Sequence, residues 1–488
     1  MVKNVGVSVP GNRAALLEAE WQRLCDLYLP LHQSGSIWRY HCVQPANEPE
    51  RGWKLHISAT VLNAGRVLQK VGQALAGRGV QFKAPSSLQH VITINAGLDG
   101  TYTQIGKIIT VYPFTSEQAV ELARLLHKLT SRMAAPEVPF DLRYRPSSNV
   151  YYRFGAFVPL EIENANGTRT PAVRGPNGEL IPDRRDQPNP DGIPDPFQVR
   201  QRRHSAIGLQ NSSSTSYRVF GALAQRGKGG VYQAADLSSK TPRLCLIKEG
   251  RKHGELNWDG RDGRWRVRNE ERVLSELLAH GINVPRVYSS FELEGNAYLV
   301  MEFIAGQTLQ SLLSKLQRRM PISRVLKYGI QLAEFISMMH GAGWVWRDCK
   351  PMNLVVTRTG RLQPLDFEGA CRINRPDPML WGTPGFIPPE WRTLKKYTGR
   401  TDDLYALGSI LYLLATGRVP SLTDPISPAK LRRNIPDSLS KLIIRLLSLD
   451  RRKRPSAAKT LARLNQIRES RRLIEPAATG HCASWQGQ

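Results

Sequence analysis

The spacing of apolar residues divides the first part of the chain into strands and helices. Apolar and polar residues alternate over 54–58, which predicts a strand, and apolar residues recur at near-helical spacing over 61–75. A second strand is expected over 107–112. The segment Thr115-Ser-Glu-Gln118 forms a capping box that opens a helix through about residue 132. Residues 1–158 are therefore expected to form an N-terminal domain that mixes helices and strands.

The second half of the chain has strands first and helices after them. Strand patterns cover 217–250 and 297–303, and helical patterns cover 309–340, 402–416 and 439–449. We therefore expect residues 216–470 to form a second domain with two lobes of different class. The fold class that follows is multidomain α+β.

A change in composition separates these two parts. Residues 159–196 hold eight prolines with several Gly, Asn and Asp, and residues 211–216 read Asn-Ser-Ser-Ser-Thr-Ser. We expect residues 159–215 to form an extended connector that is stiff where proline is frequent and flexible near the serines. Residues 471–488 are expected to form a loose tail.

The composition is that of an ordinary globular protein, with 488 residues of which 41% are hydrophobic and 22% charged. No apolar run reaches the roughly 18 residues of a membrane span, and the first residues lack the basic and apolar regions of a signal peptide. A cytoplasmic protein without membrane contact is expected. The six cysteines include no C-x-x-C pair, so neither a zinc knuckle nor a disulfide framework is predicted.

The net charge of +27 is concentrated in the second half of the chain. Lys and Arg number 17 against 10 Asp and Glu in residues 1–158, 7 against 7 in 159–215, and 44 against 24 in 216–488. Such an excess suggests an acidic partner or a nucleic acid. The basic runs at 201–203 and 451–454 lack interleaved aromatic residues, which makes nucleic acid the weaker alternative.

Short motifs follow one another in a fixed order in the second domain. They begin with a glycine-rich turn at 227–232 and a lysine in Leu246-Ile-Lys248. The motifs that follow are Trp346-Arg-Asp-Cys-Lys-Pro-Met-Asn353, Leu365-Asp-Phe-Glu368, Gly382-Thr-Pro-Gly-Phe-Ile-Pro-Pro-Glu390, Asp403-Leu-Tyr-Ala-Leu-Gly408 and Arg454-Pro-Ser456. In this order and spacing the series resembles the eukaryotic-type Ser/Thr protein kinases, whose fold is bilobal α+β.

That resemblance implies a role for each matching residue. Asp348 would accept the proton of the substrate hydroxyl, Lys350 would steady the γ-phosphate of ATP or GTP, and Asn353 and Asp366 would bind Mg²⁺. Lys248 would hold the α- and β-phosphates and pair with Glu270. The full set of expected nucleotide-binding residues is Gly227, Gly229, Gly230, Val231, Lys248, Glu270, Met301, Glu302 and Phe303.

The kinase motifs also depart from the family pattern in places. Arg226 stands where a middle glycine would stand, Trp346 replaces the usual histidine, and Glu368 replaces the usual glycine. No catalytic position is lost, so a pseudokinase is the weaker alternative. Residues 366–390 contain no Ser or Tyr and only Thr383, which belongs to the Gly-Thr-Pro motif. We therefore expect a kinase that needs no activation-loop phosphorylation.

Cationic residues recur on the predicted strands of the N-terminal domain. Lys54 and His56 lie two residues apart and share a strand face, while Leu55 and Ile57 point to the core. This face is either an anion site or a solvated outer surface. The other cations on strand-like or loop segments are Lys83, Lys107, Arg143, Arg145 and Arg153, and each alone is more typical of a surface charge.

Taken together, these segments resemble the lyase domain of class III and class IV lanthipeptide synthetases, which is in turn similar to the phosphothreonine lyases of bacterial effectors. The matching segments are Trp53-Lys-Leu-His-Ile-Ser-Ala59, Phe82-Lys83, Ile105-Gly-Lys-Ile-Ile-Thr-Val-Tyr-Pro113 and Val150-Tyr-Tyr-Arg-Phe-Gly155. The resemblance covers about residues 50–158 as a core and continues in 177–185 and 195–197. Residues 1–45 carry less of it.

The resemblance to this lyase domain implies β-elimination of phosphate from phosphoserine or phosphothreonine, which leaves dehydroalanine or dehydrobutyrine. Lys83 would be the base and His56 the acid. The phosphate would be held by Lys54, Lys107, Arg143 and Arg153, with Tyr112 or Tyr152 nearby. Neighbouring cations and a partly apolar pocket would lower the pKa of Lys83 enough for it to act as a base. Arg143 and Arg145 would share a strand face, so the choice between them stays open.

The two domains together predict a bifunctional peptide dehydratase that first phosphorylates Ser/Thr of a precursor peptide and then eliminates the phosphate. The alternative is a Ser/Thr protein kinase whose N-terminal domain only binds phosphopeptides or regulates the kinase. The expected partner is a precursor peptide with an acidic leader. Because the chain ends soon after the kinase motifs, we expect the cyclase domain of the described synthetases to be absent, so that a separate cyclase closes rings or the product stays linear.

Overall fold

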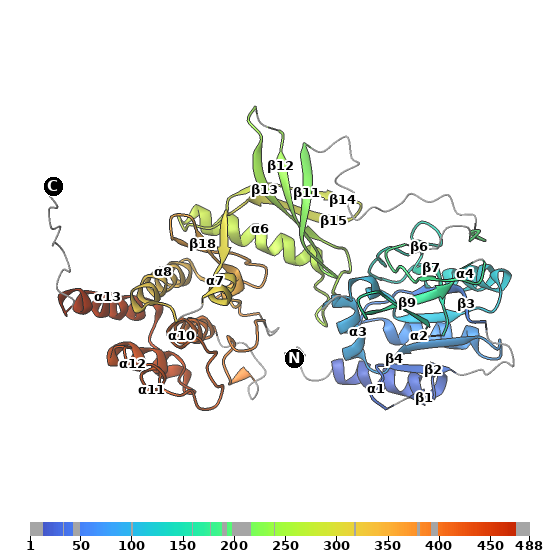
Figure 1. Cartoon of the computed structure of the whole chain (residues 1–488), viewed down its shortest axis with the longest axis horizontal. Helices are drawn as coiled ribbons and strands as arrows, with labels where there is room; N and C mark the ends of the chain where they lie inside the picture. The colour runs from blue at the N-terminus through green and yellow to red at the C-terminus, as the bar shows by residue number, and fades with distance from the viewer. Residues whose placement is uncertain are drawn as a thin grey trace, which may run out of the picture. The chain divides into compact units, whose positions relative to one another are not determined.

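The computed structural model describes most of the chain, in two compact units. The described residues are 13–32, 34–41, 49–98, 101–158, 160–175, 177–187, 193–197, 216–238, 240–316, 319–377, 381–391 and 399–474. One unit comprises 9–268 and 287–302, and the other comprises 1–8, 269–286 and 303–488. Each unit combines helices with strands (Figure 1), which confirms the multidomain α+β fold class. In these ranges no helix is both long enough and apolar enough to cross a bilayer.

A seven-stranded sheet forms the centre of the N-terminal domain. Its order is β1-β2-β4-β5-β3-β7-β6, and neighbouring strands pair antiparallel. The strands are β1 (Leu31–His32), β2 (Trp38–His41), β3 (Arg51–Ile57), β4 (Gln81–Pro85), β5 (Ile109–Tyr112), β6 (Leu142–Arg143) and β7 (Val150–Ala156). The helices are α1 (Arg13–Tyr28), α2 (Ala64–Leu75), α3 (Leu88–Ala96) and α4 (Ser116–Thr130), with a 3-10 turn, η1, at Tyr102–Gln104. The strands and helices predicted from periodicity are therefore present.

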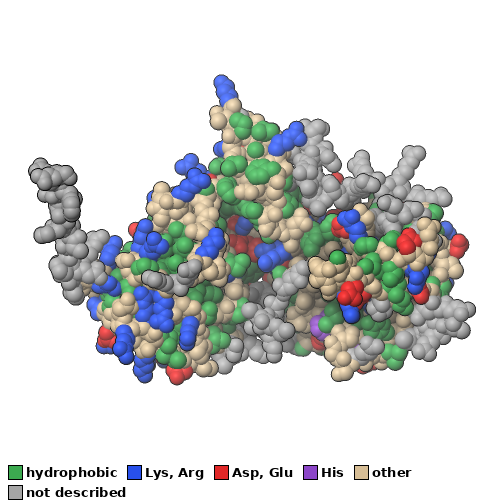
Figure 2. All heavy atoms as spheres, viewed as in Figure 1, with side chains coloured by type: hydrophobic (Ala, Val, Ile, Leu, Met, Phe, Trp, Pro, Cys, Tyr) green, Lys and Arg blue, Asp and Glu red, His purple; other side chains and the backbone are tan. Residues whose placement is uncertain are grey.

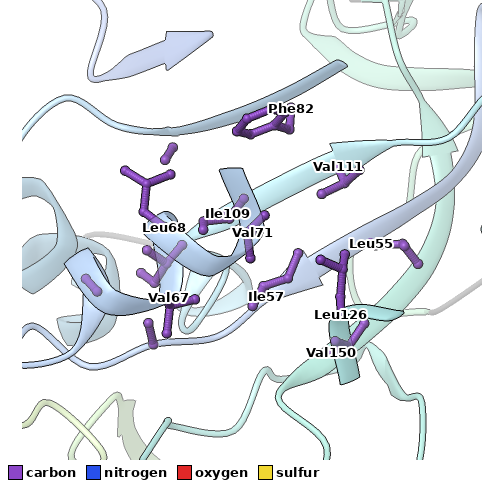
Figure 3. Close-up of a cluster of buried hydrophobic side chains, with 14 of the residues drawn as sticks. Leu55, Ile57, Val67, Leu68, Val71, Phe82, Ile109, Val111, Leu126 and Val150 are labelled. Atoms are coloured by element: carbon purple, nitrogen blue, oxygen red, sulfur yellow. The ribbon is translucent and has the colours of Figure 1, made fainter. Parts of the chain in front are cut away.

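One face of this sheet packs against helices to form the core. Leu55 and Ile57 on β3 are fully buried, and Val67, Leu68 and Val71 on α2 lie against the same cluster (Figure 3). Side chains alternate across a strand, so the burial of residues 55 and 57 turns residues 54 and 56 to the opposite face. The cationic residues therefore lie on the sheet face opposite the helices.

The capping box expected at the start of α4 is present. The Thr115 hydroxyl accepts a hydrogen bond from the backbone amide of Gln118 at 3.2 Å. In return, the Gln118 side chain accepts one from the backbone amide of Phe114 at 2.7 Å. The first bond satisfies an amide that the helix itself leaves unpaired, and the second goes to the residue before the N-cap and not to the N-cap amide.

The segment expected to be an extended connector instead contains a three-stranded antiparallel sheet, in the order β10-β9-β8. Its strands are β8 (Leu160–Glu163), β9 (Arg169–Arg174) and β10 (Leu180–Pro182). Asn-Gly pairs at 166–167 and 177–178 form the turns, with φ of 77° at Gly167 and 88° at Gly178. Asn-Gly pairs strongly favour hairpin turns, but the expectation of an extended connector was based chiefly on the prolines. Most of residues 188–215 lie outside the description.

The kinase region contains a five-stranded antiparallel sheet and a helical part. The sheet has the order β11-β12-β13-β15-β14. Its strands are β11 (Tyr217–Arg226), β12 (Gly229–Asp236), β13 (Arg243–Gly250), β14 (Val287–Leu293) and β15 (Asn296–Glu302), and helix α6 spans Gly263–Ala279. This is the strand-rich first lobe that the sequence predicts.

Helices dominate the remainder of the kinase region. They are α7 (Leu309–Lys315), α8 (Ile322–Gly341), α10 (Arg400–Thr416), α11 (Pro428–Leu431), α12 (Asp437–Leu446) and α13 (Ala457–Ile474), accompanied by two 3-10 turns, η2 (Pro351–Asn353) and η3 (Arg451–Lys453). One small sheet contains β16 (Gly306–Thr308), β18 (Leu354–Thr357) and β19 (Leu362–Pro364). A second small sheet pairs β17 (Trp344–Val345) with β20 (Cys371–Arg372). The helical pattern over 309–340 corresponds to two helices. Pro321 is the residue before α8, and a proline is tolerated at the start of a helix but not in its interior.

Candidate active sites

A row of polar side chains crosses the open face of the seven-stranded sheet. Strand pairing places Tyr40 opposite Lys83, Lys83 opposite Thr110, and Thr110 opposite His56. The row continues from His56 to Tyr151 and from Tyr151 to Arg143. Residues directly opposite one another in an antiparallel sheet point to the same side. The pairing therefore brings Lys83 and His56, which the sequence separates by 27 positions, to one face.

Asp141 joins His56 to Lys107 beneath this face. The His56 Nδ1 atom lies 2.5 Å from one Asp141 carboxylate oxygen, and Lys107 Nζ donates to the other at 2.7 Å. All three side chains are buried. Burial alone would raise the pKa of Asp141, but the charge of Lys107 and the contact with His56 hold it well below its ordinary value, so the carboxylate stays ionised. An ionised Asp141 fixes the proton of His56 on Nδ1 and directs Nε2 away from the carboxylate.

The imidazole of His56 is neutral while the site holds no phosphate. Burial lowers the pKa of His56 to about 4, and Lys107 and Arg153 lower it further, against the opposing effect of Asp141. A phosphate dianion beside Nε2 would raise this pKa again, because it favours the charged imidazolium. The ability of His56 to donate a proton is thus linked to the binding of an anion.

Lys83 is surrounded by aromatic rings on the same face. Its Nζ lies 4.5 Å from the centroid of Trp38, 5.9 Å from that of Tyr40 and 5.9 Å from that of Tyr112. Burial, with a smaller effect from Arg185, lowers the pKa of Lys83 from 10.5 to about 8. About a tenth of this amine is therefore unprotonated at pH 7, far more than for an ordinary lysine, and a general base must be unprotonated to act.

Lys54 and Arg153 form a second row beside the first. They are directly opposite one another on β3 and β7, and the Arg153 guanidinium is 2.5 Å from the carboxylate of Asp183. Lys54 Nζ lies 5.7 Å from the ring of Tyr112. Burial, followed by the charge of Arg153, lowers the pKa of Lys54 from 10.5 to about 7. A half-buried lysine beside a buried arginine makes this part of the face suited to an anion.

The structure separates the two arginines that the sequence could not distinguish. Arg143 lies on β6 opposite Tyr151, and its guanidinium donates to the Tyr151 hydroxyl and to Glu137, both at 2.6 Å. Arg145 lies beyond the end of β6, is exposed, and stacks over Tyr144 at 5.2 Å. The expectation that both share a strand face was wrong, because β6 ends at Arg143.

The aromatic neighbours also divide between the two faces. Tyr112 contacts both Lys54 and Lys83, whereas the ring of Tyr152 lies in the core, 3.9 Å from that of Phe197. Tyr112 is therefore the tyrosine of the expected pair that belongs to the site. Sequence reasoning missed Asp141, Trp38, Tyr40 and Tyr151, whose positions follow from strand pairing over long sequence separations.

In the kinase region, Asp348 is held by three polar side chains. Lys350 Nζ donates to Asp348 Oδ2 at 2.7 Å, and the Thr383 hydroxyl donates to Oδ1 at 3.0 Å. The Asn353 amide donates to the backbone carbonyl of Asp348 at 2.9 Å and to Oδ2 at 3.1 Å. Burial raises the pKa of Asp348, and Lys350 opposes this effect. The carboxylate expected to accept the substrate proton is thus oriented and less acidic than usual.

Asp403 on α10 fixes the backbone that carries this carboxylate. Its two carboxylate oxygens accept hydrogen bonds from the amides of Trp346 at 2.9 Å and Arg347 at 2.8 Å, and His340 Nε2 lies 2.9 Å away. Trp346, which replaces the usual histidine, stacks on Phe367 at 5.5 Å between centroids. The substitution is therefore accommodated by packing within the helical part.

The expected metal ligands have suitable chemistry. The Asn353 amide uses its nitrogen for both bonds to Asp348, so its oxygen is the atom that can face a cation. The carbonyl of Asp366 accepts a hydrogen bond from the Trp346 indole at 3.0 Å, and Asp366 has a φ of 65°. A carboxylate and an amide oxygen are ligands that Mg²⁺ accepts together with substrate phosphates.

The other expected nucleotide-binding residues lie on both units. Gly227 lies in the turn between β11 and β12, Lys248 is on β13, and Met301 and Glu302 end β15. Gly229, Gly230 and Val231 begin β12, and Phe303 follows β15. Glu270 on α6 is completely buried and accepts a hydrogen bond from the backbone amide of Phe367 at 3.1 Å.

A carboxylate of the activation segment binds the arginine next to Asp348. Arg347 is fully buried and donates to Asp377 at 2.8 Å and to the carbonyl of Gly369 at 3.1 Å. In kinases that are switched by phosphorylation, new arginine–phosphate pairs order the activation loop. Asp377 supplies a permanent negative charge at Arg347, which supports the expectation that no phosphate is needed.

Asp377→Asn is therefore expected to slow peptide phosphorylation by about tenfold or more, because it removes the carboxylate charge beside the buried Arg347. The measurement is incorporation of labelled phosphate, with the exposed Asp424→Asn as control. The wild-type protein should also keep its rate after phosphatase treatment. Loss of activity on dephosphorylation, or an Asp377→Asn rate equal to that of the wild type, would contradict this interpretation.

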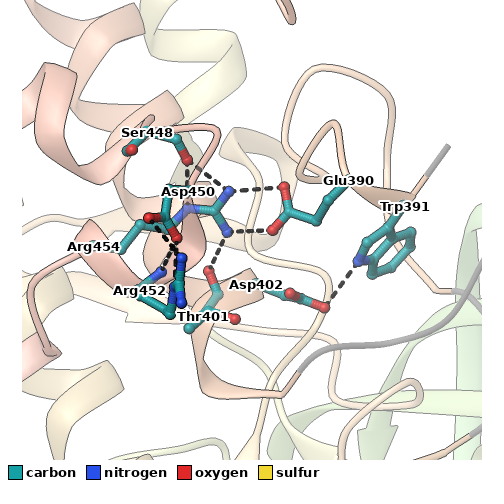
Figure 4. A network of polar contacts seen from close by, with 8 residues as sticks. All are labelled: Glu390, Trp391, Thr401, Asp402, Ser448, Asp450, Arg452 and Arg454. Atoms are coloured by element: carbon teal, nitrogen blue, oxygen red, sulfur yellow. Dashed lines mark hydrogen bonds and ion pairs between the residues drawn. The ribbon is translucent and has the colours of Figure 1, made fainter. Parts of the chain in front are cut away.

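Arg454 closes a second buried network in the helical part (Figure 4). Its guanidinium forms two hydrogen bonds with the carboxylate of Glu390, at 2.7 and 2.8 Å, and others with the carbonyls of Thr401 and Ser448. The Arg454 side chain has no exposed surface. This arginine is structural, so the basic run 451–454 presents three exposed cations and not four.

Glu390→Gln is expected to destabilise the kinase region by about 3–5 kcal/mol, because breaking a buried ion pair leaves Arg454 uncompensated. Calorimetric melting of the full chain measures the shift. Asp437→Asn is the matched control, because Asp437 pairs with Lys441 on the surface of α12 with both side chains more than 70% exposed. A surface pair of this kind contributes less than about 1 kcal/mol. Equal shifts for the two variants would refute the structural role.

Two protein-family models match separate parts of the chain. A family model described as the RamC N-terminal domain matches residues 31–206, and a protein kinase domain model matches residues 222–464. The first match extends through the sheet β8–β10, and the second begins within β11. The two sites described above therefore fall within separate matched regions.

The curated proteins similar to this chain include a synthase and several protein kinases. A probable SapB synthase from Streptomyces coelicolor is 29% identical over 412 residues, which cover 81% of this chain and 42% of that protein. Two serine/threonine-protein kinases, PksC of Streptomyces coelicolor and pkn2 of Myxococcus xanthus, are each 30% identical over about half of this chain and cover 47% and 31% of their own lengths. The chain spans less than half the length of each of these relatives.

Proposed function

We propose that this chain, which joins a RamC N-terminal domain to a protein kinase domain, dehydrates Ser and Thr residues of a peptide in two steps. The kinase domain transfers a phosphoryl group from a nucleoside triphosphate to the hydroxyl. The N-terminal domain then eliminates that phosphate and leaves a carbon–carbon double bond. The net change is the loss of one water from each modified residue.

In the first step, Asp348 accepts the proton of the peptide hydroxyl as the oxygen attacks the γ-phosphorus. Lys350, which already contacts Asp348, offsets the negative charge that spreads over the transferred group. Asn353 and Asp366 would hold Mg²⁺, which supplies charge neutralisation on the phosphates. Protein kinase domains in general use ATP and Mg²⁺. GTP is the alternative phosphoryl donor, and phosphorylation should be measured with each nucleotide.

In the second step, the neutral amine of Lys83 takes the proton from Cα of the phosphorylated residue. The electron pair of that C–H bond forms the Cα–Cβ double bond, and the Cβ–O bond breaks with its electrons on the phosphate oxygen. His56 Nε2, protonated in response to the bound dianion, donates a proton to the departing phosphate. Lys54, Lys107 and Arg153 offset its charge.

One observation carries this proposal, namely the placement of Lys83 and His56 in one row across a buried, cationic sheet face. They are separated by one intervening strand, so their backbones lie about 10 Å apart. A phosphorylated residue bound over Thr110, the residue between them, would have the base on one side and the acid on the other. A domain that only binds phosphopeptides would need the cations but not this pair.

The pH dependence of elimination should follow two lysines. The value of kcat/KM is expected to rise as Lys83 loses its proton, with a pKa of about 8, and to fall as Lys54, with a pKa of about 7, loses the charge that binds phosphate. The profile should be a bell with its maximum between these values. Lys54→Arg keeps the charge at high pH and should move the falling limb to higher pH. A falling limb at the same pH in Lys54→Arg and the wild type would contradict this assignment.

The substrate is expected to be a Ser/Thr-containing precursor peptide with an acidic leader. Lys and Arg side chains, drawn in blue in Figure 2, occur at many points on the visible surface of the kinase region. Exposed examples are Lys430 and Lys459. A leader bound by such charges would dissociate steeply with rising salt concentration.

The elimination step is tested without any nucleotide. A synthetic peptide that carries one phosphoserine is incubated with the full chain, and its mass is followed. The proposal predicts loss of the mass of phosphoric acid and a product that then adds a small thiol across the double bond. A peptide that binds to the protein but keeps its phosphate would favour a phosphopeptide-binding kinase instead.

A further inference from the structure

The loop after β10 contributes a carboxylate to the centre of the cationic face. Asp183 follows the last residue of β10, and its backbone amide donates to the carbonyl of Pro171 at 2.8 Å. Its side chain forms the 2.5 Å ion pair with Arg153, and the two side chains are only 9% and 5% exposed. A negative charge from outside the seven-stranded sheet thus lies directly on one of the residues expected to bind phosphate.

The neighbouring backbone leaves space for this ion pair. Gly155 follows Arg153 by two positions on β7 and therefore lies on the same strand face. A Cβ atom at Gly155 would come within 2.9 Å of Arg153 Nη1 and 3.4 Å of Asp183 Oδ1. A larger residue at this position would crowd both partners. The strand therefore carries a side-chain-free position where the guanidinium and the carboxylate meet.

The two carboxylates of the site have different partners. Asp141 is engaged by His56 and Lys107, so it holds the acid and one cation in position. Asp183 contacts Arg153 and also acts on the charge of Lys54, which its negative charge favours against the opposing effect of Arg153. Asp183 is therefore the anion that balances the Lys54–Arg153 row.

Arg153 is not fully satisfied by this carboxylate. Its Nη2 atom donates to Asp183 and lies 3.4 Å from the carbonyl of Arg184. Its Nε atom is buried and has no hydrogen-bond partner among the described residues. A buried donor without a partner is costly. A phosphate group, with three acceptor oxygens and up to two negative charges, can satisfy donors that a single carboxylate leaves open.

We propose that Asp183 is an internal competitor of the substrate phosphate. Asp183 neutralises Arg153 while the site is empty, leaves it when a phosphate dianion enters, and returns to it as free phosphate departs. The proposal rests on the lyase function proposed above and adds a role in product release to it. No covalent bond is made or broken in this exchange.

The sign of the effect follows from electrostatics. A carboxylate and a phosphate dianion next to the same guanidinium repel each other, so the negative charge of Asp183 weakens phosphate binding. Asp183→Asn removes the charge and keeps the shape. We expect this variant to bind inorganic phosphate about tenfold more tightly than the wild type, which corresponds to about 1.4 kcal/mol. A residue that merely orients Arg153 would give weaker binding in the same variant.

Isothermal titration of the full chain with inorganic phosphate measures this effect. Asp186→Asn is the matched control, because Asp186 lies three residues away and pairs at 2.8 Å with Arg184 on the surface. It should bind phosphate like the wild type, and Arg153→Met should lose binding at this site. Binding by Asp183→Asn that is equal to or weaker than that of the wild type would overturn the proposal.

A second measurement uses only the wild-type protein and therefore does not depend on the folding of a variant. If phosphate displaces Asp183, hydrogen exchange of backbone amides in residues 180–187 should become faster when phosphate is added. Unchanged or slower exchange there would also overturn the proposal. Elimination from the phosphoserine peptide is measured in parallel, because its failure would remove the lyase function even if phosphate and Asp183 compete.

Discussion

Lys83→Ala should stop the reaction at the phosphopeptide. The kinase site is untouched by this change, so Ser and Thr residues are still phosphorylated, but the base that takes the α-proton is missing. Loss of a general base is expected to slow elimination by about 10²–10⁴-fold. Mass spectrometry of the peptide product after incubation with ATP and Mg²⁺ should show added phosphoryl groups where the wild type shows lost water.

The control for this experiment is Lys128→Ala, which removes an exposed lysine from the last turn of α4. It should dehydrate the peptide like the wild type. His56→Ala should resemble Lys83→Ala, because it removes the acid of the same step. Full dehydration by either His56→Ala or Lys83→Ala would show that the row across the sheet does not perform the elimination.

Asp348→Asn should have the opposite phenotype and leave the peptide unmodified. The amide cannot accept the hydroxyl proton, and it also removes the charge that holds Lys350 at 2.7 Å. Phosphorylation should fall by about 10²–10⁴-fold. The same variant should still eliminate phosphate from the synthetic phosphoserine peptide, because the N-terminal site is intact.

The comparison of Asp348→Asn with Lys83→Ala tests the division of labour directly. Each variant keeps the half-reaction that the other lacks, so a mixture of the two should dehydrate peptide that either alone leaves unmodified or phosphorylated. Identical products from the two single variants would mean that both residues serve one step, and the two-site interpretation would fail.

Local pattern was sufficient to place much of the N-terminal site. The alternation in residues 54–58 put Lys54 and His56 on one face, and strand pairing confirms that this face is opposite the core. Asp141 could not be found in this way, because it acts on His56 across 85 residues and on Lys107 across 34. Contacts of that separation depend on which strands pair, and periodicity does not determine this.

The segment after β7 shows a different limit. Its prolines favoured an extended connector, but the Asn-Gly turns at 166–167 and 177–178 close hairpins, and the sheet they form delivers Asp183 to Arg153. The Asn-Gly turns could be predicted from the sequence. The packing of the β8–β10 sheet against β7, which brings Asp183 to Arg153, could not be predicted from it.

Ordered motifs placed the kinase residues without knowledge of the fold. The structure shows how the departures from the kinase motifs are accommodated. Trp346 packs on Phe367, and Asp377 forms an ion pair with Arg347, which precedes Asp348. The charge of residues 216–488 is only partly explained. Arg347 and Arg454 are buried in ion pairs, whereas residues such as Lys430 and Lys459 are exposed on the surface.

The most direct test of the central claim is the mass of a Ser/Thr-containing peptide after incubation with the wild-type chain, ATP and Mg²⁺. Sequential phosphorylation and elimination predict a product that is lighter by one water for each modified residue, with phosphorylated species seen only early in the time course. A product that keeps stable phosphoryl groups at long times would contradict the claim and leave a protein kinase with a phosphate-binding N-terminal domain.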